Sequence, residues 1–443
     1  HVWMVKRKRA SGNARGAKAG GSKASSSKAG KGEAFADADV HSDDEASSGD
    51  EGAAAASDED GDAFFETPDE KRVRLAKEYL SKLGETKLPD QVGDQLAQDV
   101  AEEQRRSRIQ IADVELGEAT FRKGHRYPAT CVCLSSDERT AYTGGKDCAI
   151  LRWDIETGTK DVLNDGGRNK FDCGGHFQHV RGVCLVESRQ LLLSVGVDQV
   201  VRFWDWRAPA KSSCTAKLLG HHGPINAVVA EPDGKQFYTA SDDKSLKVWD
   251  LTARRETDTL LGHVTGVTTM DLYNQARPLT GGADKTVRLW KTDKDTHLMF
   301  SKHVYSVDAV SVMDHDRFLS GSQDGNLHLW STASKKPLAS ASLGSNCWVT
   351  AVAAIRRGNV FFSGSIDGML RTWRCTREGK EDSALKIIPA AKPVDAPGVV
   401  NAVAVGHRLL ACAIGKEHKL GRWVYEKKDK NGLLVVPISY REE

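Results

Sequence analysis

The chain contains 443 residues, of which 39% are hydrophobic, and its formal net charge is +2. This length allows one large domain with additional segments, and no apolar run approaches the length of a membrane-spanning helix. Its nine cysteines include no Cys-x-x-Cys pair, a composition typical of a reducing compartment and unlike a disulfide framework.

The N-terminal part of the chain separates its charges into two blocks. Residues 1–32 carry nine basic and no acidic side chains, whereas residues 33–70 carry fifteen acidic and no basic side chains. Such segments bury too little apolar surface to fold on their own. We therefore expect residues 1–66 to form a disordered tail that is first basic and then acidic.

Two short signals lie within this tail. A tight basic cluster predicts a nuclear import signal, with a merely solvating tail as the alternative; it consists of Lys6, Arg7, Lys8 and Arg9. Three serines are each followed within three residues by at least two acidic residues. Acid-directed phosphorylation is predicted at Ser42, Ser48 and Ser57.

A helical extension is predicted over residues 67–108. Thr67-Pro68-Asp69-Glu70 supplies an N-cap, a proline at the first helical position and acids at the positive end of the helix dipole. Apolar residues then recur at helical spacing as far as Leu83, and a second helical stretch covers about residues 91–108. We expect both stretches to pack on the outside of the main domain or on another molecule.

Residues 119–440 are dominated by a repeat of roughly forty to fifty positions. Seven tryptophans mark the units: Trp153, Trp204, Trp249, Trp290, Trp330, Trp373 and Trp423. An aspartate lies six positions before each of the first six tryptophans, and a serine or threonine lies ten positions before. A histidine lies 27 or 28 positions before each of the first five. A period of this length indicates a repeat architecture.

The third unit shows what each repeat forms. Residues 225–230, 236–241 and 245–250 are short runs rich in β-branched and aromatic residues, separated by turn residues, and a further strand leads into the next histidine. Four antiparallel strands per unit, repeated radially, predict an all-β fold with seven propeller blades.

The repeated residues also indicate a family. Gly220-His221 followed by Trp249-Asp250 resembles the WD-repeat family, whose seven units imply a seven-bladed β-propeller. We interpret each set as a buried polar tetrad in which histidine bonds the aspartate and the hydroxyl while the indole donates its own N–H. The five complete tetrads are His125, Thr143, Asp147 and Trp153; His176, Ser194, Asp198 and Trp204; His221, Thr239, Asp243 and Trp249; His263, Thr280, Asp284 and Trp290; and His303, Ser320, Asp324 and Trp330.

Histidine, serine and aspartate together are also the parts of a hydrolytic triad. The set occurs five times, each time with a tryptophan, whereas an active site needs to be built once. The sequence also has no P-loop, no His-Glu-x-x-His motif and no cysteine-rich metal set. We therefore expect no catalytic residues, no metal site and no cofactor.

Units six and seven depart from the pattern. Ser345 and Asn346 stand where the sixth histidine is expected, which indicates drift or a loop given over to a partner, and Ala413 and Glu417 replace the hydroxyl and the aspartate before Trp423. Ring closure is left open between two strands, residues 119–123 and 433–438. The N-terminal strand is favoured to pair with the strand that contains Trp423, because closed propellers commonly join their chain ends.

Three stretches carry a narrower resemblance that extends over nearly the whole chain from Glu66. Residues 66–80, Lys146-Asp147-Cys148 and residues 415–423 resemble the WD-repeat proteins of the U3 small nucleolar ribonucleoprotein. The resemblance implies a nucleolar, non-catalytic protein that acts as a monomer within a larger complex. Its implied partners are the B/C motif of the U3 box C/D RNA, a small kink-turn-binding protein and other proteins of the small-subunit processome, where pre-ribosomal RNA is processed toward 18S RNA.

Basic residues on predicted loops are the candidate RNA contacts, because RNA held by its backbone requires lysine and arginine more than a base-reading groove. The candidates are Arg122, Lys123, Arg126, Lys146, Arg181, Lys416, His418, Lys419 and Arg422. A protein–protein adaptor or substrate-recognition subunit that uses the central channel and makes no direct RNA contact is the alternative.

Overall fold

The computed structural model describes residues 108–164, 166, 174–207, 214–273, 277–292, 296–344, 347–377, 385–422 and 428–442. The expected tail, residues 67–107 of the expected helical extension, the predicted import signal and the three predicted phosphorylation sites lie outside these residues. Ser345, Asn346 and Trp423 also lie outside them. Within the described part, no helix has the length and apolar character needed to cross a membrane.

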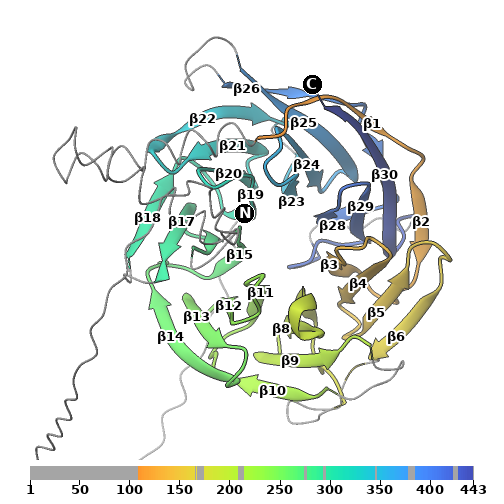
Figure 1. Ribbon diagram of the computed structural model, residues 1–443, viewed down its shortest axis with the longest axis vertical. Helices are drawn as coiled ribbons and strands as arrows, with labels where there is room; N and C mark the ends of the chain where they lie inside the picture. The colour runs from red at the N-terminus through yellow and green to blue at the C-terminus, as the bar shows by residue number, and fades with distance from the viewer. Residues whose placement is uncertain are drawn as a thin grey trace, which may run out of the picture. The chain divides into compact units, whose positions relative to one another are not determined.

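The described residues form seven antiparallel sheets arranged as a ring, which confirms the predicted seven-bladed propeller (Figure 1). Blade one contains β3 (Ala129–Leu134), β4 (Thr140–Gly145), β5 (Ile150–Asp154) and β6 (Lys160–Asn164). Blade two contains β7 (Val180–Val186), the 3₁₀ turn η1 (Glu187–Arg189), β8 (Leu191–Gly196), β9 (Val200–Asp205) and β10 (Ala216–Leu219). Blade three contains β11 (Ile225–Ala230), β12 (Gln236–Ser241), β13 (Ser245–Asp250) and β14 (Arg255–Leu261).

The remaining blades follow the same order from the channel outward. Blade four contains β15 (Val267–Asp271), β16 (Leu279–Gly282), β17 (Thr286–Lys291) and β18 (Thr296–Ser301). Blade five contains β19 (Val307–Val312), β20 (Arg317–Ser322), β21 (Asn326–Ser331) and β22 (Ser334–Ser342). Blade six contains β23 (Val349–Ala354), β24 (Val360–Ser365), β25 (Met369–Arg377), β26 (Leu385–Pro389) and the short β27 (Val394–Asp395). Blade seven contains β28 (Val399–Val405), β29 (Leu409–Gly415), β30 (Gly432–Glu442), β1 (Ile111–Leu116) and β2 (Thr120–Lys123).

The hydrophobic core lies between neighbouring blades. Between blades two and three, Phe203 meets Phe237 edge to face at 5.8 Å between ring centroids, and Phe237 stacks on Trp249 at 5.9 Å. Two of the inner strands, β19 and β23, are buried along their whole length, because neighbouring blades cover both of their faces. Each blade is therefore stabilised by its neighbours, and the ring must close for every blade to be covered.

Blade seven closes the ring in a different way from the one expected. β30 pairs directly with β29, and both β1 and β2 pair with β30, so the N-terminal strands lie outside the C-terminal strand (Figure 1). Val435 pairs with Ala411 as Trp153 pairs with Ala141 in blade one, and Val435 is buried at 3% exposure. The expectation that the third strand of this blade contains Trp423 and pairs with residues 119–123 is therefore wrong. A continuous apolar run, and not a tryptophan, marks this central strand.

The N-terminal segment crosses two blades before it joins blade seven. The Arg108 guanidinium forms ion pairs with Asp314 and Asp316 of the β19–β20 loop. Ile109 then donates its backbone N–H to the Arg357 carbonyl at 2.9 Å, and Ile111 begins β1, ahead of the expected boundary at residue 119. These contacts fasten the start of the described chain to blades five and six.

A belt of hydrogen bonds links the inner strands around the channel. In five blades the second residue of the inner strand, or the third in blade seven, donates its side chain to a backbone carbonyl of the next blade. The donors and acceptors are Thr130 to Val180, Asn226 to Val267, Thr268 to Val307, Thr350 to Val400, and Asn401 to Ala129. The last bond joins blade seven to blade one, so the belt crosses the point where the ring closes.

Candidate nucleic-acid interface

The tetrad residues lie at one edge of every blade that has them. In blade one, Ala129 at the start of β3 pairs with Gly145 at the end of β4. The loop 125–128 and the turn with Asp147 therefore meet at the same edge, and the other blades repeat this register. We call the face of the ring formed by these edges the tetrad face.

The tetrads form the hydrogen bonds that their residue types allow. In blade three, the imidazole of His221 lies 2.8 Å from Asp243 and 2.7 Å from the hydroxyl of Thr239, and the Trp249 indole donates to the same hydroxyl at 2.8 Å. Blades one, two and four repeat this geometry. In blade five, the distance from His303 to Asp324 lengthens to 3.8 Å.

In blades one to four, these hydrogen bonds favour one tautomer of the neutral histidine. Because an indole N–H can only donate, the hydroxyl oxygen accepts it and gives its own proton to Nε2 of the histidine. Nδ1 therefore carries the other proton and donates to the carboxylate. Burial alone would raise the pKa of Asp243, but hydrogen bonds from His221 and Ser245 outweigh it and hold the pKa below its usual range. In blades one to four, the four groups of each tetrad are thus hydrogen-bonded to one another.

Blade six keeps half of this arrangement. The Trp373 indole donates to the Ser363 hydroxyl at 2.8 Å. Asp367 pairs with Arg371 at 2.7 Å, where the other blades use a histidine. An arginine four residues along the chain thus satisfies the carboxylate, so the missing histidine leaves no buried charge unpaired here.

Five of the nine candidate RNA-binding residues interact instead with other parts of the propeller. Arg122 donates to the carbonyls of Asp154 and Ile155, and Arg181 pairs with Asp242 at 3.2 Å. Lys146 is 11% exposed and pairs with Glu417 at 3.2 Å. His418 and Lys419 are the other two.

His418 and Lys419 enter the channel mouth from blade seven. The His418 ring is fully buried against Trp348, with 4.3 Å between centroids, and burial lowers its pKa to about 2. The Lys419 ammonium donates to the carbonyls of Asp308 and Thr350, each at 3.4 Å. Burial lowers the pKa of Lys419, against the opposing effect of the Asp308 carboxylate. Burial likewise raises the pKa of Asp308.

The remaining candidates lie toward solvent beside the same loop. Lys123, Arg126 and Arg422 are exposed, and Lys416 is half-buried. The Arg422 side chain is 65% exposed and has Glu417 at 3.5 Å. Residues 416–422, here called the blade-seven loop, thus turn His418 and Lys419 inward and leave Arg422 on the surface.

Two asparagines that the sequence did not single out hold the blade-seven loop. Asn401 accepts from the Lys419 backbone N–H at 2.8 Å and donates to the Glu417 carbonyl at 3.0 Å. Asn431 accepts from the Lys416 N–H at 2.9 Å and donates to the Arg126 carbonyl at 3.1 Å. Their only sequence signal was their position beside predicted strands.

Gly415 lies immediately before this loop, where the neighbouring residues leave no room for a side chain. A Cβ atom there would lie 2.6 Å from Cβ of Pro128 and 2.7 Å from Nδ2 of Asn401. Such distances are far inside van der Waals contact, so the residue before the loop packs directly on blade one. The loop and residues 126–128 therefore form one continuous surface, which we call the seven–one surface.

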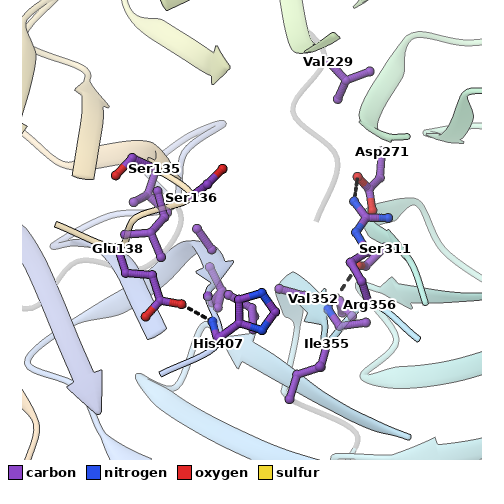
Figure 2. Close-up of a pocket in the computed structure, with 18 of the residues that line it drawn as sticks. Ser135, Ser136, Glu138, Val229, Asp271, Ser311, Val352, Ile355, Arg356 and His407 are labelled. Carbon is purple, nitrogen blue, oxygen red and sulfur yellow. Dashed lines mark hydrogen bonds and ion pairs between the residues drawn. The ribbon is translucent and has the colours of Figure 1, made fainter. Parts of the chain in front are cut away.

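A cavity opens on the opposite face of the ring. It has a volume of about 540 Å³, and its wall combines apolar side chains with polar and charged ones such as Ser311, Asp271 and Arg356. Each blade contributes at least one apolar wall residue, among them Val132, Val183, Val228, Met270, Val310, Val352 and Val403. Figure 2 shows its rim, where Arg356 pairs with Asp271 at 3.0 Å and Glu138 accepts from the His407 backbone N–H. These rim charges are satisfied within the protein.

Known proteins share both the repeats and the overall fold. A U3 snoRNP-associated protein-like from Arabidopsis thaliana is 27% identical over 422 residues, which cover 84% of this chain and 86% of that protein. The human U3 small nucleolar RNA-interacting protein 2 is 27% identical over 405 residues, which cover 84% and 82%. The structure described as "Crystal structure of RRP9 WD40 repeats" is 26% identical with a TM-score of 0.65, and the match covers 75% of this chain and 99% of that one.

The family match follows the blades. The WD domain, G-beta repeat family matches residues 118–154, 167–205, 212–250, 254–291, 295–331 and 336–374. The last match ends before β28, in agreement with the loss of the tetrad pattern in blade seven. Because these repeats cover more than half of the chain and the sheets have the geometry described above, the chain belongs to the WD-repeat family.

Proposed function

We propose that this protein is a non-catalytic RNA-binding and scaffold subunit of the U3 box C/D small nucleolar ribonucleoprotein. It contacts the B/C motif of the RNA through the seven–one surface and acts in pre-rRNA processing and in small ribosomal subunit (18S) biogenesis in the nucleolus. A small kink-turn-binding protein and other processome proteins are its neighbours there. The names of the relatives, which associate with U3 snoRNP or interact with U3 RNA, support this proposal.

One observation carries the choice of surface. Asparagines hold the blade-seven loop at Lys416, Glu417 and Lys419, yet the loop leaves Arg422 exposed. Asn431 also links the start of the loop to the exposed Arg126 of blade one. A loop that is already ordered loses little conformational entropy when it binds. Cations on such a loop suit the phosphate backbone of a folded RNA.

The test measures the affinity of the full chain for a U3 RNA fragment that contains the B/C motif, over a series of salt concentrations. The double variant Lys416→Glu with Arg422→Glu is expected to bind at least tenfold more weakly and with a shallower salt dependence, because fewer counterions are released from the RNA. Lys285→Glu changes an exposed lysine in the equivalent turn of blade four and serves as the control. Equal affinities and equal slopes for the two variants would remove the seven–one surface from the proposal.

An adaptor function is the second candidate, and the cavity on the opposite face, to which every blade contributes an apolar residue, favours it. Seven apolar side chains around a channel suit an apolar anchor from a partner protein. If RNA crosslinks to the full chain fell only within residues 1–107 and none fell on the blades, the adaptor function would be the better account.

A further inference from the structure

Tyr127 is an exposed aromatic residue in the middle of the seven–one surface. Its side chain is 51% exposed, and it lies two residues after the tetrad histidine His125. Scattered exposed apolar residues are ordinary in proteins. A large aromatic ring among cations, on the surface proposed to bind RNA, has a more specific chemistry.

The backbone around Tyr127 is fixed on both sides. The Arg126 N–H donates to the Asp147 carboxylate at 2.9 Å, and the Arg126 carbonyl accepts from Asn431 at 3.1 Å. Pro128 has a restricted φ angle, and its carbonyl accepts from the Lys146 N–H at 2.9 Å. The ring is therefore presented on a rigid support and does not need to be ordered by its ligand.

The charges around the ring indicate what it receives. The Arg126 guanidinium lies 5.6 Å from the centroid of the Tyr127 ring, and Asn431 links Arg126 to the backbone of Lys416. Proteins bind unpaired nucleotides by stacking bases on aromatic side chains while basic side chains hold the phosphates. A protein partner would need a broader apolar surface than one ring between cations.

We propose that Tyr127 is a stacking platform for one unpaired base of the bound RNA, with Arg126 and the blade-seven loop holding the phosphates beside it. This inference rests on the proposed function, because the RNA must first engage the seven–one surface. It adds a base contact to an interface otherwise made of backbone contacts. None of the nine residues predicted from the sequence is a tyrosine, phenylalanine or tryptophan, so the sequence analysis did not identify this contact.

The chain contains a matched control for this contact. Tyr305 lies two residues after His303 in blade five and is 56% exposed, so it occupies the equivalent place on the tetrad face. Its preceding residue is Val304, where blade one has Arg126. A tyrosine of the same exposure without the flanking guanidinium separates the effect of this site from the general effect of removing a surface ring.

The experiment measures binding of the full chain to the same B/C-motif RNA for wild type, Tyr127→Ala, Tyr127→Phe and Tyr305→Ala. Stacking of a base on tyrosine involves no charged group and releases no counterions. Tyr127→Ala is therefore expected to weaken binding about ten- to a hundredfold and to leave the salt slope unchanged. Tyr127→Phe keeps the ring and is expected to bind within about threefold of wild type. Tyr305→Ala is expected to bind like wild type.

Three results overturn the inference in distinguishable ways. If Tyr127→Ala binds as well as Tyr305→Ala while wild type binds the RNA, the stacking contact is absent and the proposed function stands. If Tyr127→Ala weakens binding but also flattens the salt slope, the loss belongs to phosphate contacts of Arg126. If wild type itself does not bind the RNA, the proposed function fails and takes this inference with it.

Discussion

The imidazole of His418 packs on the indole of Trp348 with 4.3 Å between their ring centroids, so a residue of blade seven rests on a residue next to the inner strand of blade six. The same indole donates to the Asp308 carboxylate of blade five at 2.5 Å. Three blades thus meet beneath the blade-seven loop. The contacts of His418 and Lys419 thus anchor to the ring the loop that is proposed to bind RNA.

Lys419 is predicted to act by anchoring the blade-seven loop to blades five and six. Its ammonium contacts the carbonyls of Asp308 and Thr350, and a phosphate contact would require it to leave both. Lys419→Met is expected to lower the free energy of unfolding by about 1–3 kcal/mol, because two carbonyls lose their donor and the buried Asp308 carboxylate loses a nearby cation. RNA affinity should fall with an unchanged salt slope. A shallower slope with unchanged stability would show that Lys419 contacts phosphate directly.

Two buried histidines should make stability sensitive to mild acid. Burial lowers the pKa of His418 to about 2 and that of His328 to about 4, from 6.5. Between pH 6.5 and about 4 the unfolded chain takes up these protons and the folded chain does not, so stability is full above pH 6.5 and falls as the pH decreases. Each group accounts for up to about 1.4 kcal/mol per pH unit.

Thermal unfolding at pH 7.5, 6.5 and 5.5 checks this dependence. The variant His418→Phe, which keeps a ring against Trp348, should lose less stability on acidification than wild type. His222→Gln changes an exposed imidazole and serves as the control. Identical pH profiles for His418→Phe and wild type would contradict the burial of a neutral imidazole at this position.

The contribution of each tetrad hydroxyl to stability should increase with the number of side chains to which it is hydrogen-bonded. Ser320 meets both His303 and Trp330, whereas among the described residues Ser363 meets the indole of Trp373 but no histidine. Each buried polar group that is left without its hydrogen bond costs about 1–3 kcal/mol. Ser320→Ala is therefore expected to lower the free energy of unfolding about twice as much as Ser363→Ala in denaturant titrations. Equal losses would show that the histidine bond adds nothing to the fold.

The belt around the channel should contribute to ring closure. Thr350 donates to the carbonyls of Gly364 and Val400, so Thr350→Val keeps the shape of the side chain and removes both hydrogen bonds. A loss of about 1–2 kcal/mol is expected on unfolding. Thr157→Val, in an exposed turn, should change stability by less than about 0.5 kcal/mol. Comparable effects of the two variants would argue against a structural role for the belt.

The parts of the fold that could be predicted from the sequence are those marked by the repeated tetrads. Five tetrads in one register determined the blades, because drift rarely preserves four residue types at fixed spacing. Blade seven has no tetrad, so Trp423 suggested a third strand that is in fact β30. The five belt donors are threonines or asparagines, and no short-range pattern distinguishes them from surface residues.

The candidate site was less predictable because charge in a sequence does not reveal its partner. Lys146 and Arg181 have acidic partners on other blades, at Glu417 and Asp242. Such pairs depend on the closed ring and on the direction of each side chain. Tyr127 was missed for a related reason, since its exposure follows from a loop that Asp147, Lys146 and Asn431 hold in place.

The most direct test of the account is ultraviolet crosslinking of the full-length protein in cells, with sequencing of the attached RNA and mass spectrometry of the attached peptides. We expect U3 RNA to be recovered, with its B/C motif crosslinked to peptides that contain Tyr127 or residues 416–422. Recovery of U3 RNA with crosslinks only on blades three to five, or a clean preparation without U3 RNA, would contradict the claim that the seven–one surface binds this RNA.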